Sequence, residues 1–460
     1  MEIRLEVLTS TTIKQKRPWP RVSWLGQENE AVFLLDDKLI HEINLLSGRT
    51  KKKIPRLQPF LKHLVVLTTS SNETDAWLAG VLSTGELFLW NKDQDCLKTI
   101  QAAEKPKEVI KAAVASSLRL YLYVSGDGKR VLIVTPSGCI FLWEYLEFRN
   151  VLSSKSPSLR GQWSQITPEE AVRLPSAEDK EAVVHAVFIK NELLGDCCLC
   201  AFTFYSGECL RLTCLAIRWH EDVFPPVRSL PYRVHWAQQD CLLGSLIPTC
   251  EPVKSRGALI SAFSRDGLTL AVTLNQKDPK ATQVLFVNTL NFVTLCGSLK
   301  GCSNKNPMVP ATLVRSYWVG DISWTHDSLF LACMLKRGSL VLLTCQGELL
   351  TLITRGCSVE FGPAEFIPLH PLITYRPPQC TFQGSTHSVD SSASASDPMR
   401  QRFSVKTHSR LPYLVASDGY MVTTLRFLDS LSPSVLLRAL LLDATQRLEK
   451  AYRGVALSEV

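Results

Sequence analysis

A pair of tight turns with short apolar strands beside them is the sequence feature that most constrains this fold. Asp127-Gly128 and Ser137-Gly138 begin ten residues apart, and the apolar run 139–143 follows the second pair. Glycine tolerates positive φ, and a short polar side chain bonds to the local backbone, so both pairs favour tight turns. A turn, a strand, a second turn and another strand form part of one β-propeller blade.

The same unit recurs, with variations, along most of the chain. Asp327-Ser328 and Arg337-Gly338 repeat the ten-residue interval. The other copies begin with apolar strands at residues 21–24, 64–68, 183–189, 259–263 and, least regularly, 359–361 paired with 413–416. Such runs suit strands buried on both faces between neighbouring blades. The sequence therefore predicts an all-β fold, a seven-bladed WD40-like β-propeller over residues 1–428, with one or two ordinary β-sandwiches as the alternative.

Two further expectations concern how the blades are built. The N-terminal strand at residues 2–8 can complete the outer edge of a blade formed mainly by the C-terminal strands, because closure protects strand edges. Trp90 and Trp143 each end an apolar strand that follows a glycine turn. We expect both indoles to be buried at equivalent blade positions.

The cysteines indicate a reduced interior. The chain has 15 cysteines, many inside apolar strands such as Cys197-Cys198-Leu199-Cys200, and 45% of its residues are hydrophobic. With no recognisable secretory signal, they are expected to be free core residues of an intracellular protein. A metal site formed with Cys209 and Cys214 is the alternative. Strand alternation points neighbouring thiols to opposite faces, and no paired C-x-x-C motifs occur, so core packing is favoured.

The positive charges are clustered. The formal net charge is +8, and basic residues gather at 14–17, at 49–53 and at Lys105, Lys107 and Lys111. On propeller loops such clusters can attract anionic lipid head groups or an acidic partner, and Lys51, Lys52 and Lys53 are the candidate anion-contacting residues. Solvated loop tips are the other interpretation. Nucleic acid is not an expected partner, since no RNA- or DNA-binding module accompanies the charge.

Neither membrane insertion nor catalysis is predicted. The hydrophobic stretch 340–353 contains Gln346-Gly347-Glu348, which suits a turn between two strands better than a membrane span. Common phosphate, zinc and nucleophile motifs are missing from the sequence, so we expect no enzyme, cofactor or metal. The sequence assigns His185, His326 and His370 structural roles.

Three segments depart from the blade pattern. Residues 153–180 are polar and are expected to connect the third and fourth blades, and residues 379–402 are serine-rich and are expected to be a disordered insertion in the last blade. Ser432-Pro433 suits the start of a helix over 432–455. This C-terminal α-helix would begin a helical region.

The predicted helix carries a broad apolar stripe. Leu436, Leu440 and Leu448 lie on it and are the candidate partner-binding residues, because the propeller's side or further helices must cover such a stripe. The end of the chain at Val460, soon after the helix, suggests a fragment or a short form of a longer protein.

Long idiosyncratic runs support a family resemblance. Residues 1–10, 16–25, 31–38 and 85–93 closely resemble the amino-terminal region of the ciliogenesis and planar polarity effector family, which is associated with Joubert syndrome. The resemblance implies a cytoplasmic, non-catalytic scaffold at the cilium base, at the basal body and transition zone. It implies partners in the effector complex and the intraflagellar transport machinery, and links to Hedgehog signalling and planar cell polarity.

The resemblance leaves a second function open. A coat-like trafficking subunit that contacts anionic membranes directly through its basic loops would also combine a propeller with helices. Trp90-Asn91 and Trp143-Glu144 stand where a WD40 repeat has Trp-Asp, so the blades depart from regular WD40 geometry. An enzyme with a site in the central channel is a distant third possibility.

Overall fold

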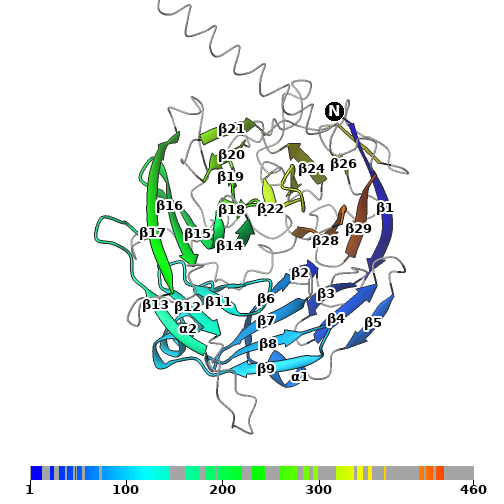
Figure 1. Ribbon diagram of the computed structural model, residues 1–460. Helices are drawn as coiled ribbons and strands as arrows, with labels where there is room; N and C mark the ends of the chain where they lie inside the picture. Colours follow the sequence, from blue (N-terminus) through cyan, green and yellow to red (C-terminus); the bar gives the residue numbers. More distant parts are fainter. Residues whose placement is uncertain are drawn as a thin grey trace, which may run out of the picture.

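A ring of β-sheets surrounds a central axis in the computed structural model of this chain (Figure 1). The structure describes residues 2–12, 21–24, 31–36, 39–44, 47, 49–53, 57–71, 75–145, 161–175, 182–191, 194–219, 231–243, 252, 259–276, 283–289, 294–298, 318–335, 339–344, 351–354, 367–368, 404–408, 411–417 and 421–428. The predicted insertion 379–402 and the predicted helix 432–455, with Leu436, Leu440 and Leu448, lie outside these residues.

Six sheets have four antiparallel strands each, in chain order from the inside of the ring outward. The first three are β2 (Arg21–Trp24), β3 (Ala31–Asp36), β4 (Leu39–Asn44) and β5 (Thr50–Lys53); β6 (Leu64–Ser71), β7 (Ala76–Leu82), β8 (Leu87–Asn91) and β9 (Cys96–Ile100); and β10 (Tyr121–Val124), β11 (Arg130–Val134), β12 (Ile140–Tyr145) and β13 (Gly161–Ile166). The next three are β14 (Val183–Asn191), β15 (Gly195–Ser206), β16 (Cys209–Trp219) and β17 (Tyr232–Leu242); β18 (Leu259–Phe263), β19 (Thr269–Leu274), β20 (Gln283–Asn288) and β21 (Thr294–Ser298); and β22 (Val319–Trp324), β23 (Phe330–Leu335), β24 (Ser339–Thr344) and β26 (Ile367–Pro368).

The remaining sheet joins both ends of the chain and has five strands. Its order is β25 (Thr351–Thr354), β1 (Glu2–Thr12), β29 (Met421–Leu428), β28 (Tyr413–Ser417) and β27 (Ser404–Thr407). β1 pairs antiparallel with β29, which confirms that the N-terminal strand completes a sheet of C-terminal strands. β25 pairs parallel with β1 on the other side, so β25 and not β1 forms the outer edge.

The propeller fold is confirmed, but the prediction of seven like blades is wrong. Six sheets are four-stranded blades, and the five-stranded sheet is a composite of distant segments. Its inner strand is Ser404–Thr407, directly after the serine-rich segment, whereas the strand predicted for that position at 359–361 lies outside the described residues. The innermost strands touch in the cyclic order β2, β6, β10, β14, β18, β22 and β27, which touches β2 again.

Two other segments differ from the prediction. The connection expected at 153–180 contains the strand β13, which pairs with β12 as the outer strand of its blade. The lysines at 105, 107 and 111 lie on the helix α2 (Glu104–Ala115), not on a loop. α2 lies between β9 and β10 in the chain and buries Ile110 and Ala113 in the core between the second and third blades.

The strands are apolar on both sides because each blade is packed between two others. In β12, Phe141 and Trp143 belong to the cluster shared with the second blade, whereas Ile140 and Leu142 belong to the cluster shared with the fourth. A strand with core on both faces has no polar face to alternate with. This arrangement explains the continuous apolar runs that define the repeat.

Both predicted tryptophans are buried at equivalent positions, as expected. Trp90 is 5% exposed and Trp143 is 1% exposed. Each is the fourth residue of the third strand of its blade, β8 or β12. Trp90 packs with Phe88 in a cluster that includes Leu57, a residue that precedes the second blade in the chain. Trp143 packs toward the second blade, which precedes its own.

The described helices are short. Besides α2 there is the four-residue α1 (Gln58–Leu61). Within the residues that the structure describes, we find no helix with the length and apolar character needed to cross a membrane.

Candidate functional site: interblade polar contacts and the inner ring

The structure places only part of the predicted site. Lys51, Lys52 and Lys53 lie on β5, the outermost strand of the first blade, where Lys52 is opposite Glu42 of β4. The Glu42 carboxylate forms an ion pair with Lys92 of the next blade, with 3.4 Å between Oε1 and Nζ. The lysines therefore lie at the rim of the ring, beside a contact between two blades. The leucine stripe cannot be brought into relation with them, since it lies outside the described residues.

Hydroxyl and carboxylate side chains close the turns between the first two strands of several blades. In the third blade, Ser125 Oγ donates to Asp127 Oδ1 at 2.6 Å and accepts the backbone N–H of Arg130 at 2.9 Å. The Asp127 carboxylate also accepts the backbone N–H of Lys129 at 3.0 Å, and Gly128 has a φ of 69°. The side chains thus satisfy backbone donors that the strand pairing leaves free.

The same turn is repeated in the fifth and sixth blades. Ser264 Oγ donates to Asp266 at 2.5 Å and accepts the N–H of Thr269 at 3.0 Å. Thr325 Oγ1 donates to Asp327 at 2.5 Å and accepts the N–H of Phe330 at 3.0 Å. These turns also link blades, because the N–H of Asp266 donates to Ser328 Oγ at 3.1 Å.

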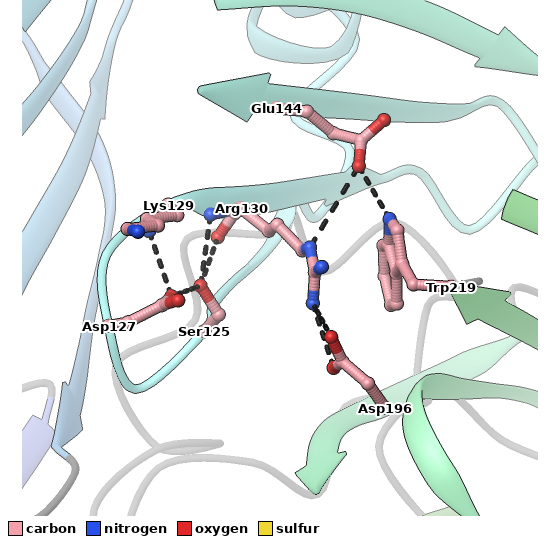
Figure 2. A network of polar contacts seen from close by, with 7 residues as sticks. All are labelled: Ser125, Asp127, Lys129, Arg130, Glu144, Asp196 and Trp219. Carbon is pink, nitrogen blue, oxygen red and sulfur yellow. Dashed lines mark hydrogen bonds and ion pairs between the residues drawn. The ribbon is translucent and has the colours of Figure 1, made fainter. Parts of the chain in front are cut away.

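A network of four charged and aromatic side chains joins the third and fourth blades (Figure 2). Arg130 of β11 donates to both carboxylate oxygens of Asp196 at 2.8 Å, and its Nε lies 3.8 Å from Glu144 Oε1. Trp219 Nε1 donates to the same Glu144 oxygen at 2.5 Å. The guanidinium lies 3.8 Å from the centre of the Trp219 ring, as in a cation–π contact.

Opposing influences act on the pKa of Glu144 in this network. Burial raises the pKa of Glu144 above its usual range, while the Trp219 hydrogen bond and the Arg130 charge act in the opposite direction. Both oxygens of Asp196 accept from Arg130, and Glu144 Oε1 contacts Arg130 and Trp219, so the arrangement holds blades together.

A second set of hydrogen bonds links the innermost strands around the axis. Tyr123 Oη donates to the Val184 carbonyl at 2.9 Å, joining the third blade to the fourth. The N–H of Phe263 donates to His185 Nδ1 at 3.1 Å, joining the fourth to the fifth. Ser323 Oγ accepts the N–H of Thr407 at 3.0 Å, which joins the sixth blade to the five-stranded sheet.

His185 is a neutral structural residue, as the sequence indicated. Its ring lies between those of Tyr123 and Phe263, at centroid distances of 5.7 and 5.9 Å. Burial, and then the positive charges of Lys406 and Arg265, lower the pKa of His185 to about 3. An uncharged imidazole can accept the Phe263 N–H, which a protonated one could not do at that nitrogen.

The cysteines of β15 and β16 are core residues. Cys198 and Cys200 face the third blade, whereas Cys197 and Cys214 face the fifth. Burial raises the pKa of Cys197 to about 11 and that of Cys214 to about 12, so these thiols stay protonated. The predicted core packing is confirmed. Among the described residues, no group of three or more His, Cys, Asp or Glu side chains could hold a metal ion.

The comparison with known proteins identifies a curated relative. No protein-family model matches the chain. Over 459 residues, the whole chain, it is 79% identical to "Ciliogenesis and planar polarity effector 1" of Mus musculus. The predicted resemblance is confirmed. The chain spans only 14% of the length of ciliogenesis and planar polarity effector 1, so what the whole mouse protein does is not thereby assigned to this chain.

One solved structure to which this chain is similar is the β-propeller domain of Cps50 (Swd1) from Myceliophteria thermophila. The similarity covers 91% of this chain and 98% of that one, at 9% sequence identity and a TM-score of 0.43. Because both the identity and the TM-score are low, the evidence for the propeller fold is the strand pairing of this chain itself.

The functional contacts were only partly visible in the sequence. Asp127 and Gly128 were recognised as a turn, but neither the part of Ser125 in it nor the network of Arg130 with Asp196 was predicted. These two residues are separated by 66 positions. The one local signal was a charged residue at the start of each of two buried strands, where an unpaired charge would be costly.

Proposed function

We propose that this chain is a non-catalytic interaction scaffold that acts in the assembly of cilia. The observation that supports the proposal is the 79% identity over the whole chain to mouse ciliogenesis and planar polarity effector 1. The proposal includes a position at the basal body and transition zone, recruitment of intraflagellar transport proteins, and contact with other members of the effector complex.

The internal chemistry of the ring supports a scaffold role. The well-formed charged contacts of the described residues, such as Arg130 with Asp196 and Arg211 with Asp240, connect strands or blades. A rigid closed ring offers its turns and rim as fixed surfaces for partners.

The proposal also covers the organisation of the chain. The propeller would extend over residues 1–428, with 379–402 as an insertion in the five-stranded sheet. Residues 432–455 would form a helix that begins a helical region. Leu436, Leu440 and Leu448 would then contact a partner or a further helical segment.

Proximity labelling in ciliated cells tests the scaffold role. The 460-residue chain, fused to a labelling enzyme, should label intraflagellar transport proteins at the cilium base. A Leu440→Asp variant should label them less while keeping its melting temperature, and Leu440→Met should behave like the parent. Equal labelling by Leu440→Asp would contradict the recruitment role of the predicted helix, and labelling confined to proteins outside cilia would contradict the function.

A coat-like subunit that meets membranes directly is the second candidate. Three consecutive lysines on the edge strand β5 favour it, since each lysine near an anionic surface adds about 1 kcal/mol of attraction. Vesicle flotation separates the two functions. Direct membrane contact predicts flotation with vesicles that contain phosphatidylserine, loss of flotation when Lys51, Lys52 and Lys53 become Gln, and none with neutral vesicles. A scaffold predicts no flotation in either case.

A further inference from the structure

The outer strand of the fourth blade is a long edge strand. β17 (Tyr232–Leu242) has 11 residues, whereas the described outer strands β5, β9, β13, β21, β25 and β26 have two to six. β17 lies on the outside of the ring, and no described strand pairs with its outer edge (Figure 1). Alternate residues over 232–240 therefore present backbone N–H and C=O groups outward.

Other outer strands carry features that discourage pairing with a further strand. β5 has three consecutive lysines, β9 contains Lys98, and β26 has two residues, one of which is Pro368. Short edges, lysines and prolines are common ways in which proteins keep a sheet from adding another strand. β17 contains no Lys, Pro or Gly, and Ala237 and Gln238 near its middle are exposed. This edge can therefore accept an added strand.

Two arginines lie side by side near one end of this edge. Arg218 of β16 and Arg233 of β17 are directly opposite each other in the antiparallel register, and both are exposed. None of the ion pairs between described residues involves either of them. Like charges directly opposite each other destabilise a sheet. A carboxylate beside this arginine pair would relieve the repulsion.

The carboxylates of the same blade do not reach the arginine pair. Asp196 precedes the β15 residue opposite Arg218, so its side chain is on the other face of the sheet, where both its oxygens accept from Arg130. Asp240 of β17 is also on the other face, where it pairs with Arg211. The face that carries the arginine pair therefore has an excess of positive charge.

Two further sources of negative charge need to be counted. The turn of the fifth blade that packs on Ile189, in register with the arginine pair, carries both Asp266 and Arg265, so its formal charges cancel. The Oδ1 atom of this aspartate also accepts a hydroxyl and a backbone N–H within the turn. Glu221 and Asp222 follow β16 in the sequence, outside the described residues. Their contribution is part of the test.

We propose that β17 is a docking edge for an extended acidic segment of a partner protein, which adds to the fourth blade as a fifth strand and places a Glu or Asp side chain beside Arg233. Hydrogen bonds between the backbones would supply affinity, and the carboxylate would set the register of the added strand. The site does not depend on the ciliary role.

A second copy of this chain fits the edge less well than an acidic segment. Two β17 edges paired about a two-fold axis would set residues of the same face opposite each other. The carboxylate of β17, Asp240, is on the face away from Arg233. Self-pairing therefore cannot bring a β17 carboxylate to the arginine pair.

Binding of labelled peptides tests the docking edge. The probe is fluorescent Thr-Val-Thr-Glu-Thr-Glu-Thr-Val-Thr, titrated with the 460-residue chain at low ionic strength. The same peptide with Gln in place of Glu should bind more weakly. The acidic peptide with N-methyl groups on alternate backbone nitrogens should not bind, because it cannot pair as a strand. This last comparison separates strand addition from simple attraction of charge.

Substitution of Arg233 tests the charge contact. Arg233→Gln should weaken binding of the acidic peptide about two- to fivefold, the range for one cross-strand charge pair, and leave the affinity of the Gln peptide unchanged. Arg233→Glu should instead favour a peptide with Lys in place of Glu. Neither variant should lower the melting temperature, because each removes the like-charge contact with Arg218.

Two variants serve as controls. Lys190→Gln removes an exposed positive charge from the inner strand β14 of the same blade and should leave affinity unchanged. The double variant Glu221→Gln and Asp222→Asn should also leave it unchanged, and a several-fold gain would show that the chain's own carboxylates occupy the arginine pair.

Such a gain would overturn the proposal. Failure of the acidic peptide to bind, equal affinity for the N-methylated peptide or the Gln peptide, or parent-like affinity of Arg233→Gln would do the same. An equal loss in Lys190→Gln would reduce the effect to net charge, and a marked fall in the melting temperature of Arg233→Gln would show that this arginine already has a stabilising partner. Either result also contradicts the site.

Discussion

At the scale of residues, the two buried tryptophans show how closely neighbouring chain segments approach in this fold. Trp143 is 1% exposed, and Gly161 of the adjacent strand lies against its indole, where a Cβ would come within 2.1 Å of Nε1. The space around the ring is therefore filled by backbone as well as by side chains. A smaller residue at position 143 would leave a cavity that backbone cannot readily move to fill.

We expect Trp143→Ala to lower the free energy of unfolding by about 3–5 kcal/mol, through lost burial and the cavity left behind. Trp90→Ala should have a similar effect, since the two residues are equivalent. Trp143→Phe fills most of the space and should cost clearly less. Urea unfolding measures all three, and a Trp143→Ala midpoint equal to that of the parent would show that the two blades do not depend on this contact.

At the scale of elements, the turns that follow inner strands pack against the preceding blade. Gly267 has a φ of 74°, and a Cβ there would lie 1.9 Å from Ile189 Cδ1 of β14. Gly207 has a φ of 59° in the turn between β15 and β16, but nothing lies within 4 Å of its Cβ position. The two glycines share the backbone requirement and differ in the space around them.

This difference allows a controlled experiment. Gly207→Ala should cost about 1–2 kcal/mol of stability, the penalty for a side chain in left-handed backbone. Gly267→Ala should cost that amount and more, since the turn or Ile189 must also move. Thermal unfolding of the two variants measures the difference. If Gly207→Ala lost as much stability as Gly267→Ala, contact with the fourth blade would not constrain this turn.

Elements with turn chemistry and apolar runs could be predicted, and elements without them could not. The inner strand Leu259–Phe263 was located because polar turn residues follow it directly. The outer strand β13 was missed because its residues are mostly polar and half exposed, as an edge strand allows. α2 was missed because its three lysines were expected on a propeller loop, and the helix also holds Pro106, which is tolerated in a first turn.

Contacts between elements were the least predictable part. The Arg130 network and the position of Arg265 against Thr407 join residues far apart in sequence. Such pairs depend on how the blades are placed around the ring, which the local pattern of one blade does not specify.

At the scale of the whole molecule, β1 holds together two segments from the far end of the chain. It lies between β25 and β29, and Leu5 is paired with Thr354 on one side and Phe427 on the other. Deleting residues 1–12 should therefore lower the melting temperature strongly and expose the edge of β29. A synthetic peptide of residues 2–12 should restore stability in trans, and a scrambled peptide should not. Unchanged melting of the deleted chain would show that the ring does not need this strand.

The position of β1 also has a consequence for synthesis on the ribosome. β1 leaves the exit tunnel long before its partner β29, which is at residues 421–428. At about 5–20 residues per second, β1 must wait roughly 20–80 s for that partner. During this time the nascent chain presents an unsatisfied strand and a row of half-covered blades, the kind of surface that chaperones bind. Codon choice and chaperone supply late in translation thus become determinants of how much functional protein a cell obtains.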